Sequence, residues 1–214
     1  MKEIICSAVL FDLDGVLVDS TPSVERQWKE WAQKNGYDPD EVIKISHGRR
    51  TIETLHIIGA QCDIAAEVSA FSAREALDLD GVEIMPGVLE LLSDLPTEKW
   101  AVVTSGTKEV AYARLKHCGI PIPKVFITAD DVQHGKPSPE GYLTAANMLQ
   151  YKPEQCVIIE DAPAGIEAAK AAGIRVIAVA TTHTHAELSA ADAVAENISG
   201  VLVKMEREKL ILLI

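Results

Sequence analysis

The sequence predicts an α/β fold: a Rossmann-like, doubly wound parallel sheet with an inserted small α-helical cap domain. Short apolar runs alternate with helical segments, which is the pattern of a parallel sheet covered by helices on both faces. The interval from Asp14 to Thr104 is far longer than the roughly 30 residues of a βαβ unit. A segment is therefore inserted between the first two core strands, and 214 residues accommodate both parts.

The core strands are expected in short runs of apolar residues, because strands of a parallel sheet are buried on both faces. Helices are expected over 108–118 and 164–172, since Gly119 and Gly173 then follow as left-handed caps. The predicted strands are 4–11, 100–103, 125–128, 156–159 and 175–179.

The insert is predicted to be helical and to form a cap of residues 20–84 on a core of residues 1–19 and 85–214. Its hinges are expected at 16–19 and at the Met85-Pro86-Gly87 turn, where proline and glycine permit a sharp return. An Ala/Glu-rich helix is expected over 63–77, and an earlier helix should pack an apolar face made of Val24, Trp28, Trp31 and Ala32. The tail 201–214 is compatible with a hairpin around 206–209 or with a frayed helix.

Acidic residues outnumber basic ones by 32 to 20, which gives a formal charge of −12. This balance argues against nucleic acid or an anionic membrane as a partner. The four cysteines are irregularly spaced, as expected of free thiols in a reducing compartment. The apolar run 4–11 is too short to cross a bilayer. We therefore expect an unprocessed cytoplasmic protein, and a monomer.

The first motif whose residues could carry out catalysis is Asp12-Leu13-Asp14-Gly15, directly after a predicted strand. The two-residue period of extended chain places both carboxylates on one side, and the glycine permits a tight turn. One carboxylate can then act as a nucleophile while the other transfers protons. An acidic turn explains this motif equally well when it is taken alone.

Three further motifs follow later predicted strands. Thr104 and Ser105 open a helix, where hydroxyls and backbone amides bind anions, although an ordinary N-cap explains them too. Lys136 is framed by two prolines and suits phosphate oxygens, or is a solvated loop lysine. Glu160 and Asp161 offer hard oxygen ligands for Mg²⁺, or an acidic N-cap. The carboxyl ends of parallel strands share one edge, so the four motifs should meet there.

In this order, DLDGVLVDS, VVTSG, GKPSPE and IIEDAPAGIEAAKAAG resemble the four motifs of the haloacid dehalogenase superfamily of phosphohydrolases. KISHGRRT, EKWAVVTSGT and VFITADDVQHGKPSPEGYL resemble its small sugar- and polyol-phosphate phosphatases, in the same group as the β-phosphoglucomutases. The resemblance runs to about Thr182, which is most of the chain.

The resemblance implies a role for each motif residue. Asp12 is implied to be the nucleophile that forms an aspartyl phosphate, and Asp14 the general acid and then base. Thr104, the amide of Ser105 and Lys136 are implied to hold the phosphoryl oxygens. The Mg²⁺ ligands are implied to be Asp12, the backbone carbonyl of Asp14 and Asp161, with Glu160 as a further ligand or a nearby acceptor.

The cap motif His47-Gly48-Arg49-Arg50-Thr51 resembles a substrate loop of these phosphatases. Arg50 is favoured for substrate contact or cap closure, ahead of Arg49 and His47, although a solvated loop is the alternative from the residues alone. β-Phosphoglucomutases carry a histidine where Val24 stands here, which favours hydrolysis over mutase activity.

We therefore expect a Mg²⁺-dependent hydrolase of small phosphorylated sugars or polyols. The alternatives are a hexose-phosphate mutase and a non-catalytic phosphate-binding regulatory protein. Trp28 and Trp31 are expected to pack the cap, and His183 and His185 to form a solvated pair.

Overall fold

A six-stranded parallel sheet forms the centre of the molecule, in a computed structural model that describes residues 2–214. The strand order is β6-β5-β2-β7-β8-β9, and every neighbouring pair is parallel. This confirms the predicted fold class, while β9 was not predicted. The strands are β2 (Ala8–Phe11), β5 (Trp100–Val103), β6 (Val125–Ile127), β7 (Cys156–Glu160), β8 (Arg175–Val179) and β9 (Ala193–Ala195).

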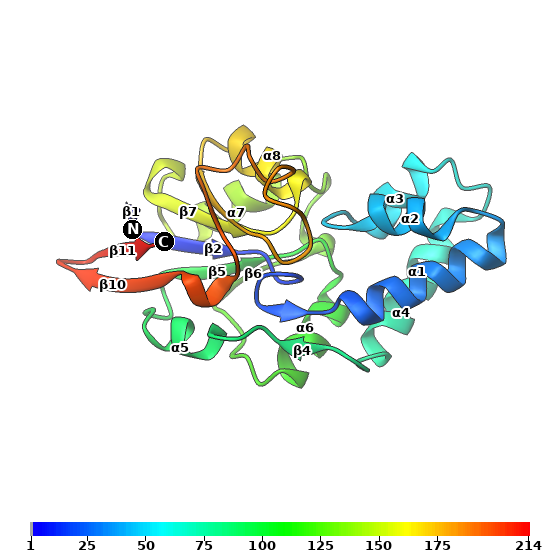
Figure 1. Cartoon of the computed structure of the whole chain (residues 1–214), viewed down its shortest axis with the longest axis horizontal. Coiled ribbons are helices and arrows are strands. Elements are labelled where there is room, and N and C mark those ends of the chain that lie inside the picture. The colour runs from blue at the N-terminus through cyan, green and yellow to red at the C-terminus, as the bar shows by residue number, and fades with distance from the viewer. Residues whose placement is uncertain (1) are drawn as a thin grey trace.

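Helices cover both faces of this sheet (Figure 1). Alternate residues of β2 point to opposite faces: Val9 and Phe11 join one hydrophobic cluster, and Ala8 and Leu10 join the other. Helices α5 (Val88–Ser93) and α6 (Lys108–His117) contribute to the first cluster. Helices α7 (Glu140–Met148) and α8 (Pro163–Ala171) contribute to the second, so the sheet is doubly wound.

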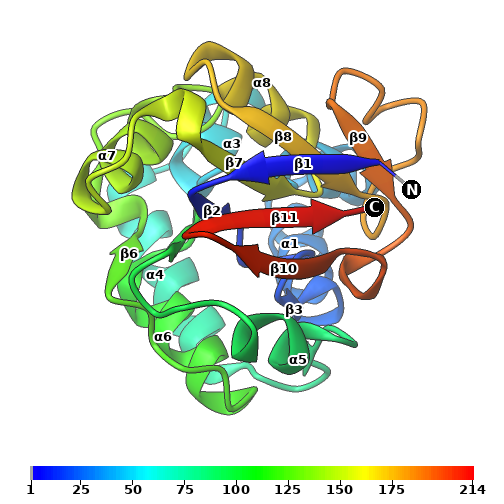
Figure 2. The ribbon, with the colours of Figure 1, turned by 90° about the vertical axis from the view of Figure 1, so that its left-hand side faces the viewer.

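The expectation of one strand over 4–11 was wrong, because the chain breaks at Ser7. β1 (Glu3–Cys6) pairs with β11 (Lys209–Leu213) in a separate antiparallel sheet of order β1-β11-β10. The Ser7 amide donates to the Gln155 carbonyl at 2.6 Å, and its hydroxyl accepts from Lys209 Nζ at 3.1 Å. These bonds mark the change of sheet. Figure 2 shows this small sheet in front, with both termini beside it.

The tail forms a hairpin, which confirms one of the two alternatives left open for it. β10 (Leu202–Glu206) pairs antiparallel with β11, with Glu206 opposite Lys209. Both residues of the two-residue turn, Arg207 and Glu208, have positive φ, at 46° and 68°. Such a turn matches the twist of the strands that it joins.

Four helices, which we call the cap helices, lie together at one end of the molecule (Figure 1). The chain enters them from β3 (Val18–Asp19) and leaves through β4 (Glu83–Ile84), and these two short strands pair antiparallel. The division into a core of 1–19 and 85–214 and a cap of 20–84 stays a prediction. The cap helices are α1 (Thr21–Asn35), α2 (Pro39–Ser46), α3 (Thr51–Ile57) and α4 (Ile64–Leu77).

The cap helices enclose an aromatic cluster of their own. Trp28 and Trp31 of α1 are buried, and the Trp28 ring lies 4.3 Å from Phe71 of α4 between centroids. Trp31 stacks on Tyr37 at 5.3 Å. The expectation that both tryptophans pack the cap is therefore confirmed, and this cluster holds α1 against α4.

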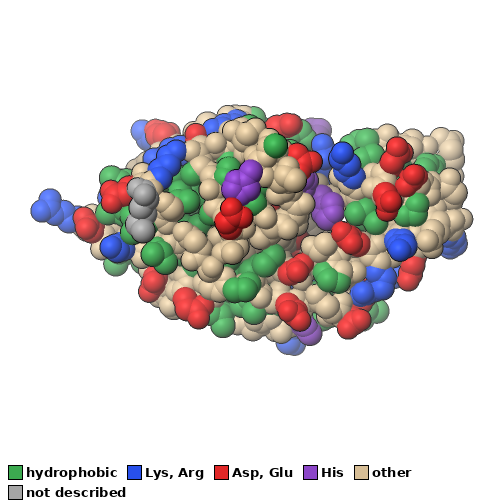
Figure 3. Space-filling view, in the orientation of Figure 1, with side chains coloured by type: hydrophobic (Ala, Val, Ile, Leu, Met, Phe, Trp, Pro, Cys, Tyr) green, Lys and Arg blue, Asp and Glu red, His purple; other side chains and the backbone are tan. Residues whose placement is uncertain are grey.

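All four cysteines are free, as expected, and Cys6 and Cys156 are buried. Over residues 2–214, no helix combines the length and the apolar character needed to cross a bilayer. On the face drawn in Figure 3, lysines and arginines are scattered among acidic side chains, in keeping with the charge of −12.

Replacing Phe71 by alanine should destabilise the cap, because Phe71 is fully buried between α1 and α4. We expect the free energy of unfolding to fall by about 3 kcal/mol, the usual cost of removing a buried phenylalanine ring. Urea unfolding followed by tryptophan fluorescence measures this, since Trp28 lies beside the ring. Leu77→Ala, at an exposed position of the same helix, is the control. A loss equal to that of the control would contradict the packing described.

Candidate functional site

The four predicted motifs meet at one edge of the central sheet, on the side of the cap helices. Asp12 follows β2, Thr104 follows β5, and Glu160 ends β7 with Asp161 next to it. Lys136 comes from the segment between β6 and α7. Figure 1 shows the carboxyl end of β2 directed toward α1, which starts the cap. Parallel strands bring these distant residues together, as expected.

Lys136 is the positive centre of this site. Its ammonium forms ion pairs with Asp12 Oδ1 and, at 2.6 Å, with Glu160 Oε1, and its side chain is only 6% exposed. Burial alone would lower the pKa of Lys136, but Asp12 and Glu160 raise it well above its usual value. The lysine is therefore charged. Burial raises the pKa of Asp12, as do Glu160 and Asp14, while Lys136 opposes the rise.

Glu160 is fully buried and has both carboxylate oxygens occupied. Oε1 accepts from Lys136 and from the Tyr142 hydroxyl at 2.9 Å. Oε2 accepts from the amides of Asp161 and Ala162, at 2.8 and 3.0 Å. Burial raises the pKa of Glu160, but Lys136 and these donors more than offset it, so the pKa lies below the usual value. Glu160 thus ties the lysine to the turn that carries Asp161.

Two glycines make room for these carboxylates. A Cβ on Gly165 would overlap the Glu160 carboxylate, and one on Gly15 would overlap Asp161. Gly15 also has a φ of +81°, which L side chains rarely adopt. Any larger residue at either position would displace an acidic side chain of the site.

Three buried carboxylates form a group that fits a divalent cation. Ligand atoms of Asp12, Glu160 and Asp161 lie within 4.8 Å of one another. The pKa of Asp161 is raised well above its usual value by burial and by the charges of Glu160 and Asp12, and its carboxylate accepts from Thr182. When all three carboxylates are ionised, Lys136 offsets only one of their negative charges, and buried charge of one sign needs a counter-ion. Hard oxygen ligands of this kind suit Mg²⁺.

Asp14 lies apart from the lysine, in a different setting. Its Oδ1 accepts from the Ser20 hydroxyl at 2.7 Å and from Arg114 Nη1 at 2.8 Å. Arg114, on α6, is 3% exposed and also pairs with Glu75 of cap helix α4 at 3.4 Å. Two aspartates separated by one residue therefore have unlike partners, as acid–base and nucleophilic roles require.

The predicted phosphate motif shows one internal bond and one contact with the cap. Thr104 is buried, and its hydroxyl accepts from the Gly106 amide at 3.0 Å. The Ser105 hydroxyl donates to the Gly48 carbonyl, in the loop between α2 and α3, at 3.0 Å. The hydroxyl of Thr107 is buried without a hydrogen-bond partner among the described residues. This motif thus supports the cap loop as well as facing the site.

The two arginines of the loop between α2 and α3 have different surroundings. Arg50 bonds to Glu53, and its guanidinium donates to the carbonyls of Val132 and Gln133 on the core at 3.3 and 3.1 Å. Arg49 lines the cavity and pairs with no carboxylate of residues 2–214. Arg50 therefore joins the cap to the core, while Arg49 lines the cavity without a carboxylate partner among the described residues.

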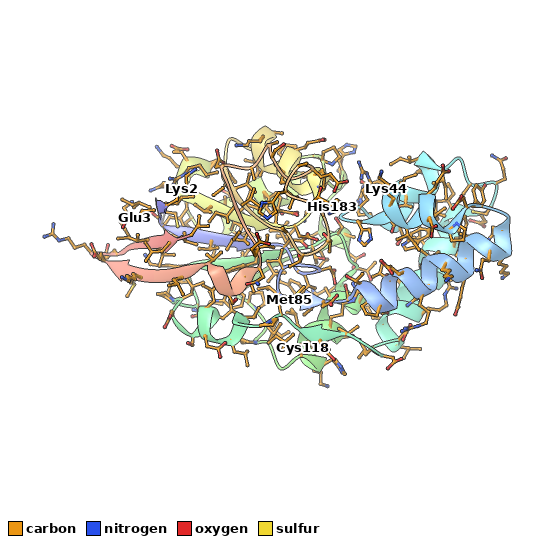
Figure 4. The ribbon with its side chains drawn as sticks, in the orientation of Figure 1. Lys2, Glu3, Lys44, Met85, Cys118 and His183 are labelled. Carbon is orange, nitrogen blue, oxygen red and sulfur yellow. The ribbon has the colours of Figure 1, made fainter. Side chains whose placement is uncertain are left out.

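His47 and His183 face each other across the boundary between cap and core. Their rings lie 5.9 Å apart, edge to face, and burial together with His183 lowers the pKa of His47. Figure 4 shows His183 on the side of the core that faces the cap, and Lys44 on cap helix α2. The expectation of a solvated histidine pair was wrong for His183, which contacts the Asp161 carbonyl at 3.1 Å, whereas His185 is exposed.

A cavity of about 280 Å³ joins the two halves of the site. Its core wall includes Asp12, Asp14, Thr104 and Asp161, and its cap wall includes residues of α1, of α4 and of the segment 46–52, which runs from the end of α2 into α3. This volume is at the small end for ligand sites. This partly open space suits a small molecule that reaches Asp12 at one end and the cap helices at the other.

Sequence reasoning missed several residues that complete the site. Tyr142 lies inside a quoted motif, and an aromatic residue in the first turns of a helix after a lysine loop was the available signal. Arg114 and Glu75 had no local signal, because each is an ordinary helix residue in the sequence. Ser20 ends the quoted motif DLDGVLVDS and Thr182 stands where the resemblance ends, and neither was assigned a role from the sequence.

Known proteins resemble this chain along most of its length. Residues 6–173 match the haloacid dehalogenase-like hydrolase family. Hexitol phosphatase A of Escherichia coli is 43% identical over an alignment of 203 residues that covers 92% of this chain and 94% of that protein. Glycerol-1-phosphate phosphohydrolase 2 of Saccharomyces cerevisiae is 40% identical over 82% of this chain and 75% of its own.

The fold has a close counterpart among solved structures. CbbY from Rhodobacter sphaeroides, solved in complex with phosphate, superposes with a TM-score of 0.79 at 26% identity, and covers 91% of this chain and 95% of its own. The resemblance seen in the motifs is thereby confirmed. The chain belongs to the haloacid dehalogenase-like hydrolases.

Proposed function

We propose that this protein is a Mg²⁺-dependent phosphomonoester hydrolase that acts on small phosphorylated sugars or polyols through an aspartyl phosphate. The observation that carries the proposal is the contrast between Asp12 and Asp14. Asp12 lies against Lys136 and the buried carboxylates, and Asp14 lies against Arg114 and Ser20. The named phosphatases similar to this chain support the class of substrate. Residence in the cytoplasm and the monomeric state stay predictions.

In this proposal Asp12, Asp161 and the backbone carbonyl of Asp14 hold the Mg²⁺. Of the three buried carboxylates, Glu160 is assigned as a nearby acceptor rather than a ligand, because four donors already occupy its oxygens. When bound, Mg²⁺ lowers the repulsion between the Asp12 carboxylate and an anionic phosphate ester. Lys136 acts in the same sense through its ion pair with Asp12 and would hold a phosphoryl oxygen, together with Thr104 and the amide of Ser105.

The reaction then has two steps. The Asp12 carboxylate attacks phosphorus, the bond from phosphorus to the ester oxygen breaks, and Asp14 gives its proton to the departing alcohol. In the second step Asp14 takes a proton from water, the water oxygen attacks phosphorus, and inorganic phosphate leaves Asp12. Asp14 suits proton transfer because Ser20 and Arg114 hold only its Oδ1. Its Oδ2 has no hydrogen-bond partner among residues 2–214.

Phosphate release from a panel of phosphomonoesters, with Mg²⁺ and with a chelator, tests this proposal. Free phosphate in the presence of Mg²⁺ supports a hydrolase. An isomerised sugar phosphate would instead indicate a mutase, which Val24, standing where the mutases have histidine, argues against. Binding without turnover would indicate a regulatory protein.

Mg²⁺ should stabilise the folded protein through Asp161. With saturating Mg²⁺ we expect the Tm of the wild type to rise by about 5 °C, since a ligand that binds only the folded state stabilises it. Differential scanning calorimetry with Mg²⁺ or EDTA measures this without an activity assay. Asp161→Asn should lose the rise, and Asp192→Asn, outside the site, should keep it. An equal rise in Asp161→Asn would remove Asp161 from the ligand set.

Asp12→Asn should abolish turnover, because an amide cannot attack phosphorus. We expect kcat to fall at least about a thousandfold, the scale seen when a nucleophile is removed. The Tm without metal should not fall, since the change removes one of several crowded negative charges. A kcat of Asp12→Asn above a tenth of the wild-type value would contradict the assignment of Asp12 as the nucleophile.

Arg50→Ala should loosen the cap, because Arg50 donates to the carbonyls of Val132 and Gln133 on the core. We expect the KM for a sugar phosphate to rise about tenfold, and more than the KM for p-nitrophenyl phosphate, since the sugar depends on contacts with a closed cap. Steady-state kinetics on both esters measures this. Arg26→Ala, whose ion pair with Asp78 lies outside the cavity, is the control. An equal rise in KM for both esters would contradict a role of Arg50 in substrate selection.

A further inference from the structure

Two cap helices each present one face to the cavity. From α4 the lining residues are Val68, Ser72 and Glu75, which are four and three positions apart. From α1 they are Thr21, Val24 and Trp28, at three and four positions. These spacings place each set on a single side of its helix.

The polarity of this cap wall changes with distance from the catalytic carboxylates. Trp28 and Val68 belong to the aromatic cluster of the cap, away from the core. Glu75 lies at the other end, where its Oε1 accepts from Arg114 Nη2, and Arg114 in turn contacts Asp14. A ligand whose ester reaches Asp14 therefore meets polar groups first and apolar groups at its far end.

Glu75 has an unused acceptor in this wall. Its side chain is 13% exposed and lines the cavity, and within residues 2–214 Oε2 accepts no hydrogen bond. The Ser72 hydroxyl, one turn away on the same face, likewise has no partner among the described residues. A half-buried carboxylate oxygen gains from a donor, because it has lost much of its water.

The charged groups around Glu75 Oε2 favour a neutral hydrogen-bond donor from the ligand. Arg114 carries one positive charge and is shared by Asp14 and Glu75, so this end of the cavity offers no unpaired positive charge. A second phosphate on the substrate would find no free cation here. A neutral hydroxyl group can donate to Glu75 Oε2 and exchange a hydrogen bond with Ser72.

We propose that Glu75 is a specificity-determining residue: its Oε2, assisted by Ser72, accepts a hydrogen bond from a hydroxyl on the carbon chain next to the phosphate ester. The inference rests on the proposed phosphatase function and narrows it to substrates with a polyhydroxylated chain and one phosphate. Arg114 is the positioning residue that holds the Glu75 carboxylate toward the cavity.

The test compares two esters, sorbitol 6-phosphate and p-nitrophenyl phosphate, on Glu75→Gln. The readout is the ratio of their kcat/KM values, because loss of a hydroxyl contact affects only the first ester. We expect this ratio to fall about tenfold, the effect of losing a hydrogen bond to a charged group. Most of the change should be in the KM for sorbitol 6-phosphate. Glu109→Gln, an exposed glutamate on α6, is the matched control and should keep the wild-type ratio.

The other outcomes distinguish this proposal from the phosphatase proposal on which it rests. A ratio within twofold of the wild type, or an equal loss on both esters, overturns the specificity role, since an equal loss means that Glu75 acts only through Arg114 on Asp14. If Glu75→Gln fails to fold, Ser72→Ala decides, with an expected fall in the ratio of about threefold. If the wild type hydrolyses neither ester with Mg²⁺, the phosphatase proposal itself fails.

Discussion

The buried lysine at the end of the sheet is the interaction on which the site depends. Lys136 contacts Asp12 and Glu160, and all three side chains are buried. A charged group that is removed from water is stable only when oppositely charged partners lie close to it. Glu160 is in turn held by Tyr142 and by two amides of the following turn. Three elements, β2, β7 and α7, are thereby fixed relative to one another. Since Asp161 adds a third carboxylate, the network stays negative and calls for a divalent cation.

Arg114 forms a second and separate charged centre. It is buried on α6 and binds Asp14 of the core and Glu75 of the cap at once. This keeps Asp14 out of the lysine network, although Asp14 is only two residues from Asp12. The different neighbours of the two aspartates thus follow from which segment supplies the cation: helix α6 supplies Arg114, and the segment between β6 and α7 supplies Lys136. The same arginine connects cap helix α4 directly to the carboxylate of Asp14 in the core. Arg50 makes separate contacts between the cap and the core.

The sequence predicted the sheet and the place of the site well, because both depend on local patterns. Apolar runs define the strands, and parallel strands necessarily gather their carboxyl-end residues at one edge. The break at Ser7 was missed because the apolar pattern continues on both sides of it, and only the bonds to Gln155 and Lys209 reveal the change of sheet. Arg114 and Glu75 could not be predicted, since 39 positions separate them and neither belongs to a local motif.

The acidity of the chain is compatible with a phosphate ligand because of how the cations near the cavity are used. Lys136, Arg114 and Arg50 are each paired with a carboxylate, so they present little free charge to a large polyanion. Arg49 lines the cavity without such a partner among the described residues. In the proposed function, a small phosphate that enters shares Lys136 with Asp12. The attraction is strong there because the distance is short and the surroundings are dry. Selection of a small anionic ester over a polymer therefore follows from burial of the cations rather than from their number.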